Sequence, residues 1–308
     1  MNLKELKSHL RDIIVPVTTP FKEDYSIDFD ALRVLMEFYL KNNIRCFIAA
    51  GTTAQCYALN KDEHRNIVRL IVNMCSDYND TFVLAGCSHA STAGSNRLAD
   101  ICQEEKADAL LLTPPICRPD SDMCIIHYLD VSKNHDIPMI IYHDKEMPED
   151  IHLWEKFASE PNILGVKFAT WNLYLAKQLI YKYRDRLIIY GGGTMLMYLS
   201  LAQHGSPGYV ASYASFIPEI EHYFVELVNK NRFKDAARIA ELEFEMFDLL
   251  GNKNWFSLLN ALINASGLPG MYVRKPLSNW EESDLPRIKK FIININKKYK
   301  EIRSSLQS

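Results

Sequence analysis

Short, continuous apolar stretches recur along the chain, and each is followed by a longer segment with a different pattern. The stretches are rich in β-branched and aliphatic residues and do not alternate with polar positions. This pattern is typical of strands that are buried on both faces of a parallel sheet. The predicted strands lie within Ile13–Phe21, Cys46–Ala54, Thr81–His89, Ala109–Pro115, Pro138–Asp144, Ile163–Thr170, Leu187–Gly193 and Gly208–Phe216.

The segments between these stretches have the spacing of amphipathic helices. One begins at Asp28, a predicted N-cap, and another begins at Asn60, where Glu63 completes a predicted capping box. Eight strand–helix units of this kind favour a closed (β/α)8 TIM-type barrel, an α/β fold. An open doubly wound sheet is the alternative, and it is weakened because the chain has neither a GxGxxG motif after the first stretch nor a P-loop.

The pattern changes after Asn231. Residues 232–250, 254–266 and 284–308 have helical spacing, and no strand-like stretch separates them. We therefore expect a barrel over residues 1–231 and a helical C-terminal extension over residues 232–308 that packs on it. The sequence contains no low-complexity segment and no Gly/Ser linker, so nothing in it indicates an autonomous second domain.

The composition is the ordinary mix of a soluble globular protein. The 308 residues include 35 Lys+Arg and 38 Asp+Glu, so the formal net charge is −3. With 48% hydrophobic residues, the chain is too apolar to be disordered. The near-neutral balance argues against nucleic acid or an anionic membrane surface as the main partner. No apolar run approaches the roughly 20 residues that span a bilayer.

The cysteines and the first residues favour a cytoplasmic location. The opening segment is charged and lacks the apolar core and cleavage site of a signal peptide. The 7 cysteines are odd in number and form no CxxC pair, which favours reduced thiols over disulfides or a zinc site. His89, His143 and Asp144 match no metal-ligand spacing, so we expect no metal.

The active sites of such barrels lie at the carboxyl ends of the strands, and this rule selects a short set of residues. Most of the set are hydroxyl, imidazole, amine or glycine residues at the ends of the apolar stretches. They are Thr18, Thr19, Gly51, Thr52, Thr53, Ser88, His89, Thr113, Tyr142, His143, Lys167, Gly191, Gly192, Gly193, Ser212 and Tyr213.

Lys167 differs most from its surroundings, because it lies within an apolar strand. Desolvation favours the neutral amine, and a neutral amine can attack a carbonyl group to form a Schiff base. The other interpretation is a lysine that extends to solvent or pairs with a carboxylate. Tyr142 ends the preceding strand, so we expect it beside Lys167, where a phenol can transfer protons. A packed aromatic residue at the rim is the simpler alternative for Tyr142.

Two glycine-containing loops can bind an anion. Gly51, Thr52 and Thr53 follow the second strand, where two hydroxyls and free backbone N–H groups can hold a carboxylate, although a plain helix-entry loop has the same sequence. The triple glycine at 191–193 follows the seventh strand, where many barrels bind phosphate. It therefore supports either a sugar phosphate or an α-keto acid, and no basic residue adjoins it.

Taken in order, these positions resemble the dihydrodipicolinate synthase/N-acetylneuraminate lyase family of Schiff-base class I barrels. The resemblance covers nearly the whole chain, and its strength lies in the register of many short motifs. They are Pro16–Phe21, Asp28, Gly51–Gln55, Ala58–Asn60, Asp62–Glu63, Ala85–Gly86, Ser91–Thr92, Thr113–Pro115, Arg118–Pro119, Pro138–Tyr142, Gly165–Lys167, Gly193 and Gly208.

The resemblance implies a role for each matching residue. Lys167 would form an imine with an α-keto acid, and Tyr142 would transfer protons with the help of Thr52. Thr53 and neighbouring amides would hold the keto-acid carboxylate. The resemblance also places Gly51, Gly193 and Ala211 in the substrate-binding site. It implies no cofactor, a 2-keto acid as the small-molecule partner, and a homodimer or homotetramer.

The sequence departs from the synthases of this family at three places. Ile116 replaces the second tyrosine of their proton relay, and no arginine follows Tyr142 to bind a second carboxylate. Ala54 and Gln55 replace a glycine and a glutamate. We therefore expect an aldolase or a dehydratase that acts on a 2-keto-3-deoxy sugar acid, because one imine makes both carbon–carbon cleavage and water loss possible.

Three alternatives stay open from the sequence. The first is dihydrodipicolinate synthase proper, which Ile116 and the missing arginine disfavour. The second is a non-catalytic relative that binds a keto acid, which Ala54 and Gln55 favour. The third is a phosphate-binding isomerase or aldolase from another barrel family, for which Gly191–Gly193 are the support.

Overall fold

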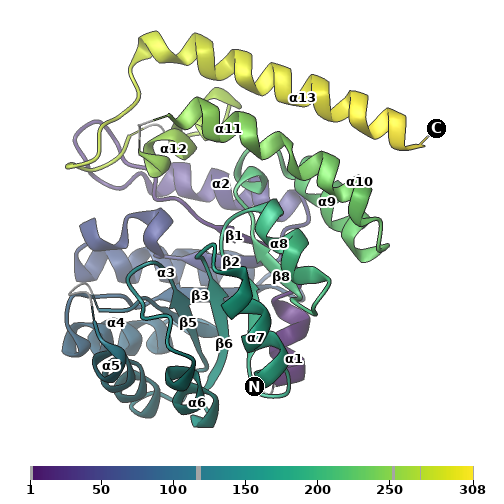
Figure 1. Cartoon of the computed structure of the whole chain (residues 1–308). Helices are drawn as coiled ribbons and strands as arrows, with labels where there is room; N and C mark the ends of the chain where they lie inside the picture. The colour runs from purple at the N-terminus through teal and green to yellow at the C-terminus, as the bar shows by residue number, and fades with distance from the viewer. Residues whose placement is uncertain (1–2, 116–118, 252–253, 271, 308) are drawn as a thin grey trace.

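Eight parallel strands close into a barrel in sequence order, as the computed structural model of residues 3–115, 119–251, 254–270 and 272–307 shows (Figure 1). The predicted TIM-type fold is therefore confirmed. Each strand occupies the first part of a predicted stretch, and the rest of the stretch forms the following loop. The strands are β1 (Asp12–Pro16), β2 (Cys46–Ala49), β3 (Phe82–Gly86), β4 (Ala109–Leu112), β5 (Met139–His143), β6 (Ile163–Phe168), β7 (Ile188–Gly191) and β8 (Gly208–Val210).

A helix follows each strand and covers the outside of the barrel (Figure 1). The predicted caps are present: Asp28 accepts a hydrogen bond from the Ala31 N–H, and Asn60 and Glu63 form a complete capping box. These caps satisfy backbone donors that the first helical turn leaves free. The helices are α2 (Phe29–Lys41), α3 (Lys61–Cys75), α4 (Thr92–Glu104), α5 (Ser121–Lys133), α6 (Ile151–Ser159), α7 (Leu173–Tyr183), α8 (Met195–Ala202) and α9 (Pro218–Asn229).

The sheet separates two apolar clusters, because successive side chains of a strand point to opposite faces. The larger cluster lies between the strands and the helices. The smaller one fills the barrel interior with residues such as Ile14, Leu84 and Ile140. Leu6 of α1 (Leu3–His9) and Leu10 belong to the interior cluster, so α1 closes the amino-terminal end of the barrel.

Four further helices follow α9, as expected for a helical extension. They are α10 (Phe233–Ala240), α11 (Leu242–Leu250), α12 (Trp255–Ala265) and α13 (Leu285–Gln307). The single helix expected over residues 232–250 is broken at Glu241. Figure 1 shows α13 lying across one side of the molecule together with α11 and α12. Division of the chain at residue 231 into two units stays a prediction. Within the described residues, no helix is both long and apolar enough to cross a bilayer.

Two buried carboxyl groups connect the later helices to the barrel loops. Glu243 of α11 accepts hydrogen bonds from the N–H groups of Met195 and Leu196, at 2.8 and 3.2 Å, in the first turn of α8. Glu221 of α9 accepts from the Tyr213 N–H at 2.9 Å. Both side chains are fully buried. Burial raises the pKa of Glu243 to about 8 and raises the pKa of Glu221 well above its ordinary value, where the Glu243 charge adds to the effect.

Replacing Glu243 by glutamine should weaken the pH dependence of stability. The folded protein keeps a proton on Glu243 up to about pH 8, whereas the unfolded chain releases it near pH 4.5. Over this window the stability of the wild-type protein falls as the pH rises, because only the folded state must retain the proton. The melting temperature of Glu243→Gln should therefore fall less than that of the wild type over this window. Parallel melting curves would contradict the assignment.

Candidate active site

Lys167 is a buried lysine on β6 that faces an aromatic ring on β5. Its side chain is only 4% exposed, and its Nζ atom lies 3.8 Å from the centre of the Tyr142 ring. The two residues are register partners across the β5–β6 pair. Within the described residues, Lys167 forms no ion pair. The arrangement therefore matches neither a solvent-exposed lysine nor one paired with a carboxylate, and a ring face is a weaker partner for an ammonium than a carboxylate.

Tyr190 on β7 lies on the other side of Lys167 and was not among the residues that the sequence singled out. It is the register partner of Lys167 across the β6–β7 pair and is fully buried. Its hydroxyl has no hydrogen-bond partner among the described residues. Burial raises its pKa well above the ordinary value, so the phenol stays neutral. The position of Tyr190 at the end of an apolar strand was the signal that could have identified it.

The loop after β2 places Thr52 and Thr53 in a tight 3-10 turn. The turn begins at Gly51, where a β-carbon would lie 2.7 Å from Cγ2 of Ile48 and would therefore be too close. The Ala54 N–H donates to the Gly51 carbonyl at 3.0 Å. Thr53 is buried, whereas Thr52 is partly exposed and lines a cavity. The turn therefore gives Thr52 and Thr53 different exposure, which their adjacent positions in the sequence did not indicate.

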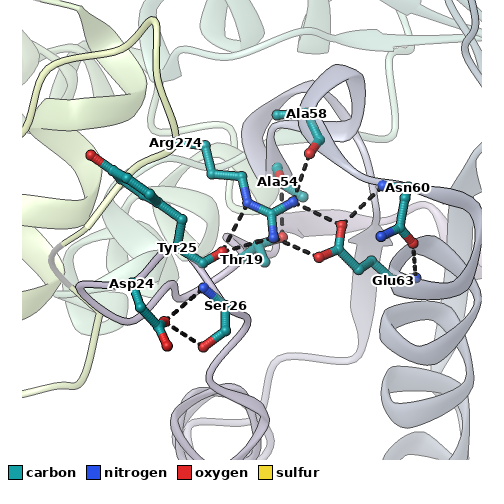
Figure 2. A network of polar contacts seen from close by, with 9 residues as sticks. All are labelled: Thr19, Asp24, Tyr25, Ser26, Ala54, Ala58, Asn60, Glu63 and Arg274. Atoms are coloured by element: carbon teal, nitrogen blue, oxygen red, sulfur yellow. Dashed lines mark hydrogen bonds and ion pairs between the residues drawn. The ribbon is translucent and has the colours of Figure 1, made fainter.

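Arg274, from the segment between α12 and α13, holds this loop in place (Figure 2). Its guanidinium donates to both carboxylate oxygens of Glu63 and to the Ala58 and Tyr25 carbonyls. The Arg274 N–H donates to Oε1 of Gln55 at 3.0 Å. Gln55, one of the departures from the family pattern, is therefore a buried contact with the C-terminal segment. No sequence motif indicated Arg274.

A cavity of about 630 Å³ opens at the carboxyl ends of β2 to β5. Hydroxyl groups of Thr52, Ser88 and Thr113 line it, together with the carboxyl groups of Asp144 and Glu146. Burial raises the pKa of Asp144, and the Glu146 charge adds to this effect, while the Lys167 charge opposes it. Lys61 and Arg97 also line this cavity, whereas Lys167 and Tyr142 are not among its lining residues. Its mixture of hydroxyl, acidic and basic groups is suited to a polar ligand.

The other predicted binding residues lie after β7 and β8. Gly193 adopts a φ of 153°, and space for a β-carbon there is open. Its carbonyl accepts a hydrogen bond from Ser212 Oγ at 3.1 Å. Ala211 is fully buried, and its N–H donates to the Ile14 carbonyl at 2.9 Å. The structure brings Lys167 and Tyr142 together, but it gives no contact of either with Gly193 or Ala211.

The phosphate interpretation of the triple glycine loses support. In phosphate-binding barrels, free N–H groups at a helix N-terminus after the seventh or eighth strand hold the anion. Here Glu243 already accepts from the Met195 and Leu196 N–H groups that begin α8. The Glu243 carboxyl group therefore occupies the position at the start of α8 where a phosphate would bind.

The metal question and the departures from the family pattern concern residues other than Lys167 and Tyr142. His143 is fully buried and stacks on Phe168 at 4.4 Å, and neither ring nitrogen has a partner among the described residues. The described part of the chain contains no group of three or more His, Cys, Asp or Glu residues that could hold a metal ion. Ile116, which replaces the relay tyrosine, and Arg118 lie outside the described residues.

Comparison with solved structures agrees with the barrel. The 4-hydroxy-tetrahydrodipicolinate synthase of Methylacidiphilum fumariolicum superposes with a TM-score of 0.86 at 20% identity, covering 96% of this chain and 98% of that chain. The dihydrodipicolinate synthase of Acinetobacter baumannii, solved as a complex with pyruvate, gives a TM-score of 0.86 at 21% identity and covers 93% of this chain and 99% of that chain. These likenesses establish the fold.

Sequence comparison establishes the family. The model of the dihydrodipicolinate synthetase family matches residues 9–295, so the chain belongs to this family. The 4-hydroxy-tetrahydrodipicolinate synthase of Alcanivorax borkumensis is 28% identical over 291 residues, which cover 91% of this chain and 96% of the relative. The synthase of Dechloromonas aromatica is 26% identical over 288 residues, covering 89% of this chain and 94% of the relative. The family resemblance seen in the motifs is therefore confirmed.

Replacing Arg274 by lysine should destabilise the protein measurably. Lysine cannot reproduce the two parallel bonds to Glu63 or reach both carbonyls, so the free energy of unfolding should fall by about 1–3 kcal/mol. Urea unfolding measures the change. Arg33→Lys is the matched control, because Arg33 pairs with Asp30 on an exposed helix surface and should change stability by only a few tenths of a kcal/mol. Equal losses in the two variants would contradict the role of Arg274.

Proposed function

We propose that the protein is a Schiff-base-forming lyase, an aldolase or a dehydratase, that acts on a 2-keto acid through an imine on Lys167. The observation that carries this proposal is the burial of Lys167 beside Tyr142, where no carboxylate of the described part of the chain pairs with it. Removal from water favours the neutral form of an amine, which is the form that attacks a carbonyl carbon. Membership of the dihydrodipicolinate synthetase family supports the same chemistry.

The surrounding residues would divide the work of the reaction. The imine at C2 makes the C3 proton acidic, and Tyr142 is near enough to Lys167 to move that proton. Thr52 lines the cavity and would hydrogen-bond the phenol or the substrate. Thr53, Gly51 and neighbouring amides would hold the keto-acid carboxylate, as the resemblance implies. Gly193 and Ala211 stay predicted binding residues.

A 2-keto-3-deoxy sugar acid is the substrate class that we propose. The segment after Tyr142 contains no arginine, and two of its side chains, Asp144 and Glu146, line the cavity as carboxyl groups. Carboxyl groups accept hydrogen bonds from sugar hydroxyls. Dihydrodipicolinate synthase activity is the alternative, and the names of the sequence relatives favour it. A non-catalytic keto-acid-binding protein would not need the buried pair of Lys167 and Tyr142.

Three parts of the functional prediction rest on the sequence and its resemblance. The homodimer or homotetramer stays a prediction, and so does the cytoplasmic location. The absence of a cofactor also stays a prediction, which follows from a mechanism in which a lysine side chain supplies the electrophilic imine.

Lys167 should be the residue that reacts with a keto acid. Incubation with pyruvate and borohydride should add one reduced adduct to the peptide that contains Lys167, and mass spectrometry would locate it. Lys167→Arg should lose the adduct and all turnover while it keeps its circular dichroism spectrum, because a guanidinium stays charged and does not attack a carbonyl. An adduct on another lysine, or no adduct with any of a panel of 2-keto acids, would refute the Schiff-base proposal.

Tyr142→Phe should impair proton transfer without unfolding the protein. The variant keeps the ring that faces Lys167 and removes only the hydroxyl. Turnover of a 2-keto-3-deoxy sugar acid should fall by about 10²–10⁴-fold, the usual range for general acid–base assistance. Pyruvate trapping on Lys167 should become slower but persist, and the melting temperature should hardly change. Full turnover would show that Tyr142 is only a packed aromatic residue.

A further inference from the structure

A second cavity lies at the amino-terminal end of the barrel, opposite to the strand ends that carry the candidate active site. It has a volume of about 470 Å³ and is formed by α1, the end of α8, the loop before β8 and the junction of α9 and α10. Leu6 and Leu10 anchor α1 there, because both belong to the apolar cluster inside the barrel. Lys167 and Tyr142 are not among the lining residues, so this cavity is separate from the site proposed for the imine.

Three cationic side chains from one helical face line this cavity. They are Lys4, Lys7 and Arg11, and Ser8 lies among them. The Leu10 N–H donates to the Leu6 carbonyl at 2.9 Å, so the helical turn continues beyond the end of α1. Residues three and four positions apart are neighbours on a helix surface. Lys4, Lys7, Ser8 and Arg11 therefore form a single stripe, which we call the basic stripe.

The cations of the basic stripe have no counterion among the described residues. None of the three forms an ion pair there, and no described aspartate or glutamate lines the cavity. Asp12, which follows Arg11 in the chain, accepts a hydrogen bond from Asn229 Nδ2 at 3.1 Å instead. Like charges three or four residues apart on a helix repel each other, and a bound anion would remove that repulsion. The stripe is a local positive charge in a protein whose formal net charge is −3.

The rest of the lining offers carbon surface and few free donors. Tyr198, Val228 and Phe233 are its large apolar or aromatic side chains. The hydroxyl groups of Tyr198, Ser206 and Ser8 each donate to a backbone carbonyl, at 3.3, 3.3 and 2.7 Å. The hydrogen-bond donors that these residues leave for a ligand are therefore chiefly the ammonium and guanidinium groups of the basic stripe. A ligand that matches this lining is negatively charged at one end and apolar at the other.

The start of α10 adds to the positive potential at the same wall. α10 begins at Phe233, and no side chain caps its first turn. The N–H groups at a helix N-terminus attract anions. Asp235 of this turn pairs with Arg232 at 2.6 Å, so the charges of these two side chains balance each other. Two segments far apart in the sequence thus present positive charge to one cavity.

We propose that this cavity binds a small phosphorylated molecule that carries an apolar or aromatic group. A phosphate monoester has close to two negative charges and three acceptor oxygens, which suit a stripe of three cations. Tyr198 and Phe233 would contact the apolar part. The volume lies within the range of about 300–1,000 Å³ that is usual for small-molecule sites. The inference goes beyond the proposed function and does not rest on it, because the cavity contains no group of the proposed reaction.

The test is calorimetric titration of the untagged full chain with phenyl phosphate and adenosine monophosphate, beside inorganic phosphate and adenosine. Lys7→Gln and Arg11→Gln each remove one cation of the basic stripe and keep a polar side chain. Lys133→Gln is the matched control, because Lys133 is an exposed lysine of α5 that does not line the cavity. Lys167→Arg is titrated too, so that binding at the candidate active site is distinguished. Sedimentation with phosphatidylglycerol vesicles distinguishes a soluble phosphate from a lipid headgroup.

The wild type should bind at least one of the two organic phosphates more tightly than inorganic phosphate or adenosine. Lys7→Gln and Arg11→Gln should each weaken this binding by about 10–100-fold, the usual effect of losing a hydrogen bond to a charged group. Both variants should keep their circular dichroism spectra, and Lys133→Gln and Lys167→Arg should keep the wild-type affinity.

Four results would overturn the inference. They are no binding of either organic phosphate, unchanged affinity in Lys7→Gln and Arg11→Gln, an equal loss in Lys133→Gln, and loss in Lys167→Arg. Sedimentation with vesicles in place of binding to the soluble probes would assign the basic stripe to a membrane surface and overturn it too. Pyruvate trapping on Lys167 is measured separately, and its failure would refute the proposed function without bearing on this cavity.

Discussion

The site depends on one constraint, which is that a lysine amine is buried at the rim of a closed barrel and none of the described carboxylates pairs with it. Moving an ammonium group out of water is costly, and the ring face of Tyr142 compensates for only part of that cost. An unprotonated amine is the form that attacks a carbonyl group. The interior layer of Tyr142, Lys167 and Tyr190 is held by the strand register, so the burial follows directly from barrel closure.

Residues from the segments after the barrel contact the loops at the carboxyl ends of β2 and β7. Arg274 reaches the capping box at the start of α3 and thereby restrains the loop of Thr52 and Thr53. Glu243 satisfies the first N–H groups of α8, directly after the triple glycine loop. Two ionisable residues distant in sequence, Arg274 and Glu243, thus fix the loops after β2 and β7, and Glu243 fills the place where a phosphate would bind. The C-terminal segment therefore helps to determine which ligands the barrel can accept.

Sequence reasoning found the residues whose type conflicts with their local pattern and missed those whose importance depends on a distant partner. Lys167 was detectable because a charged residue interrupts an apolar strand. Tyr142 was detectable because it lies at the end of the preceding strand, which neighbours the strand of Lys167. Tyr190 has an ordinary aromatic identity, and only its register with Lys167 makes it notable. Arg274 and Glu243 lie in helical or loop segments of unremarkable composition, and their partners are about 211 and 48 residues away in sequence.

The sequence by itself determined the alternation of strands and helices, the barrel, the caps at Asp28 and Asn60, and the family. These features follow from local periodicity and from short motifs in a fixed order, so they need no knowledge of distant contacts. The tertiary structure alone decided that Lys167 is buried without an ion pair to any described residue, that Asp144 lines a cavity, and that Glu243 occupies the anion position at α8. These features depend on which side chains meet after the barrel closes, and local sequence patterns do not specify contacts between segments far apart in the chain.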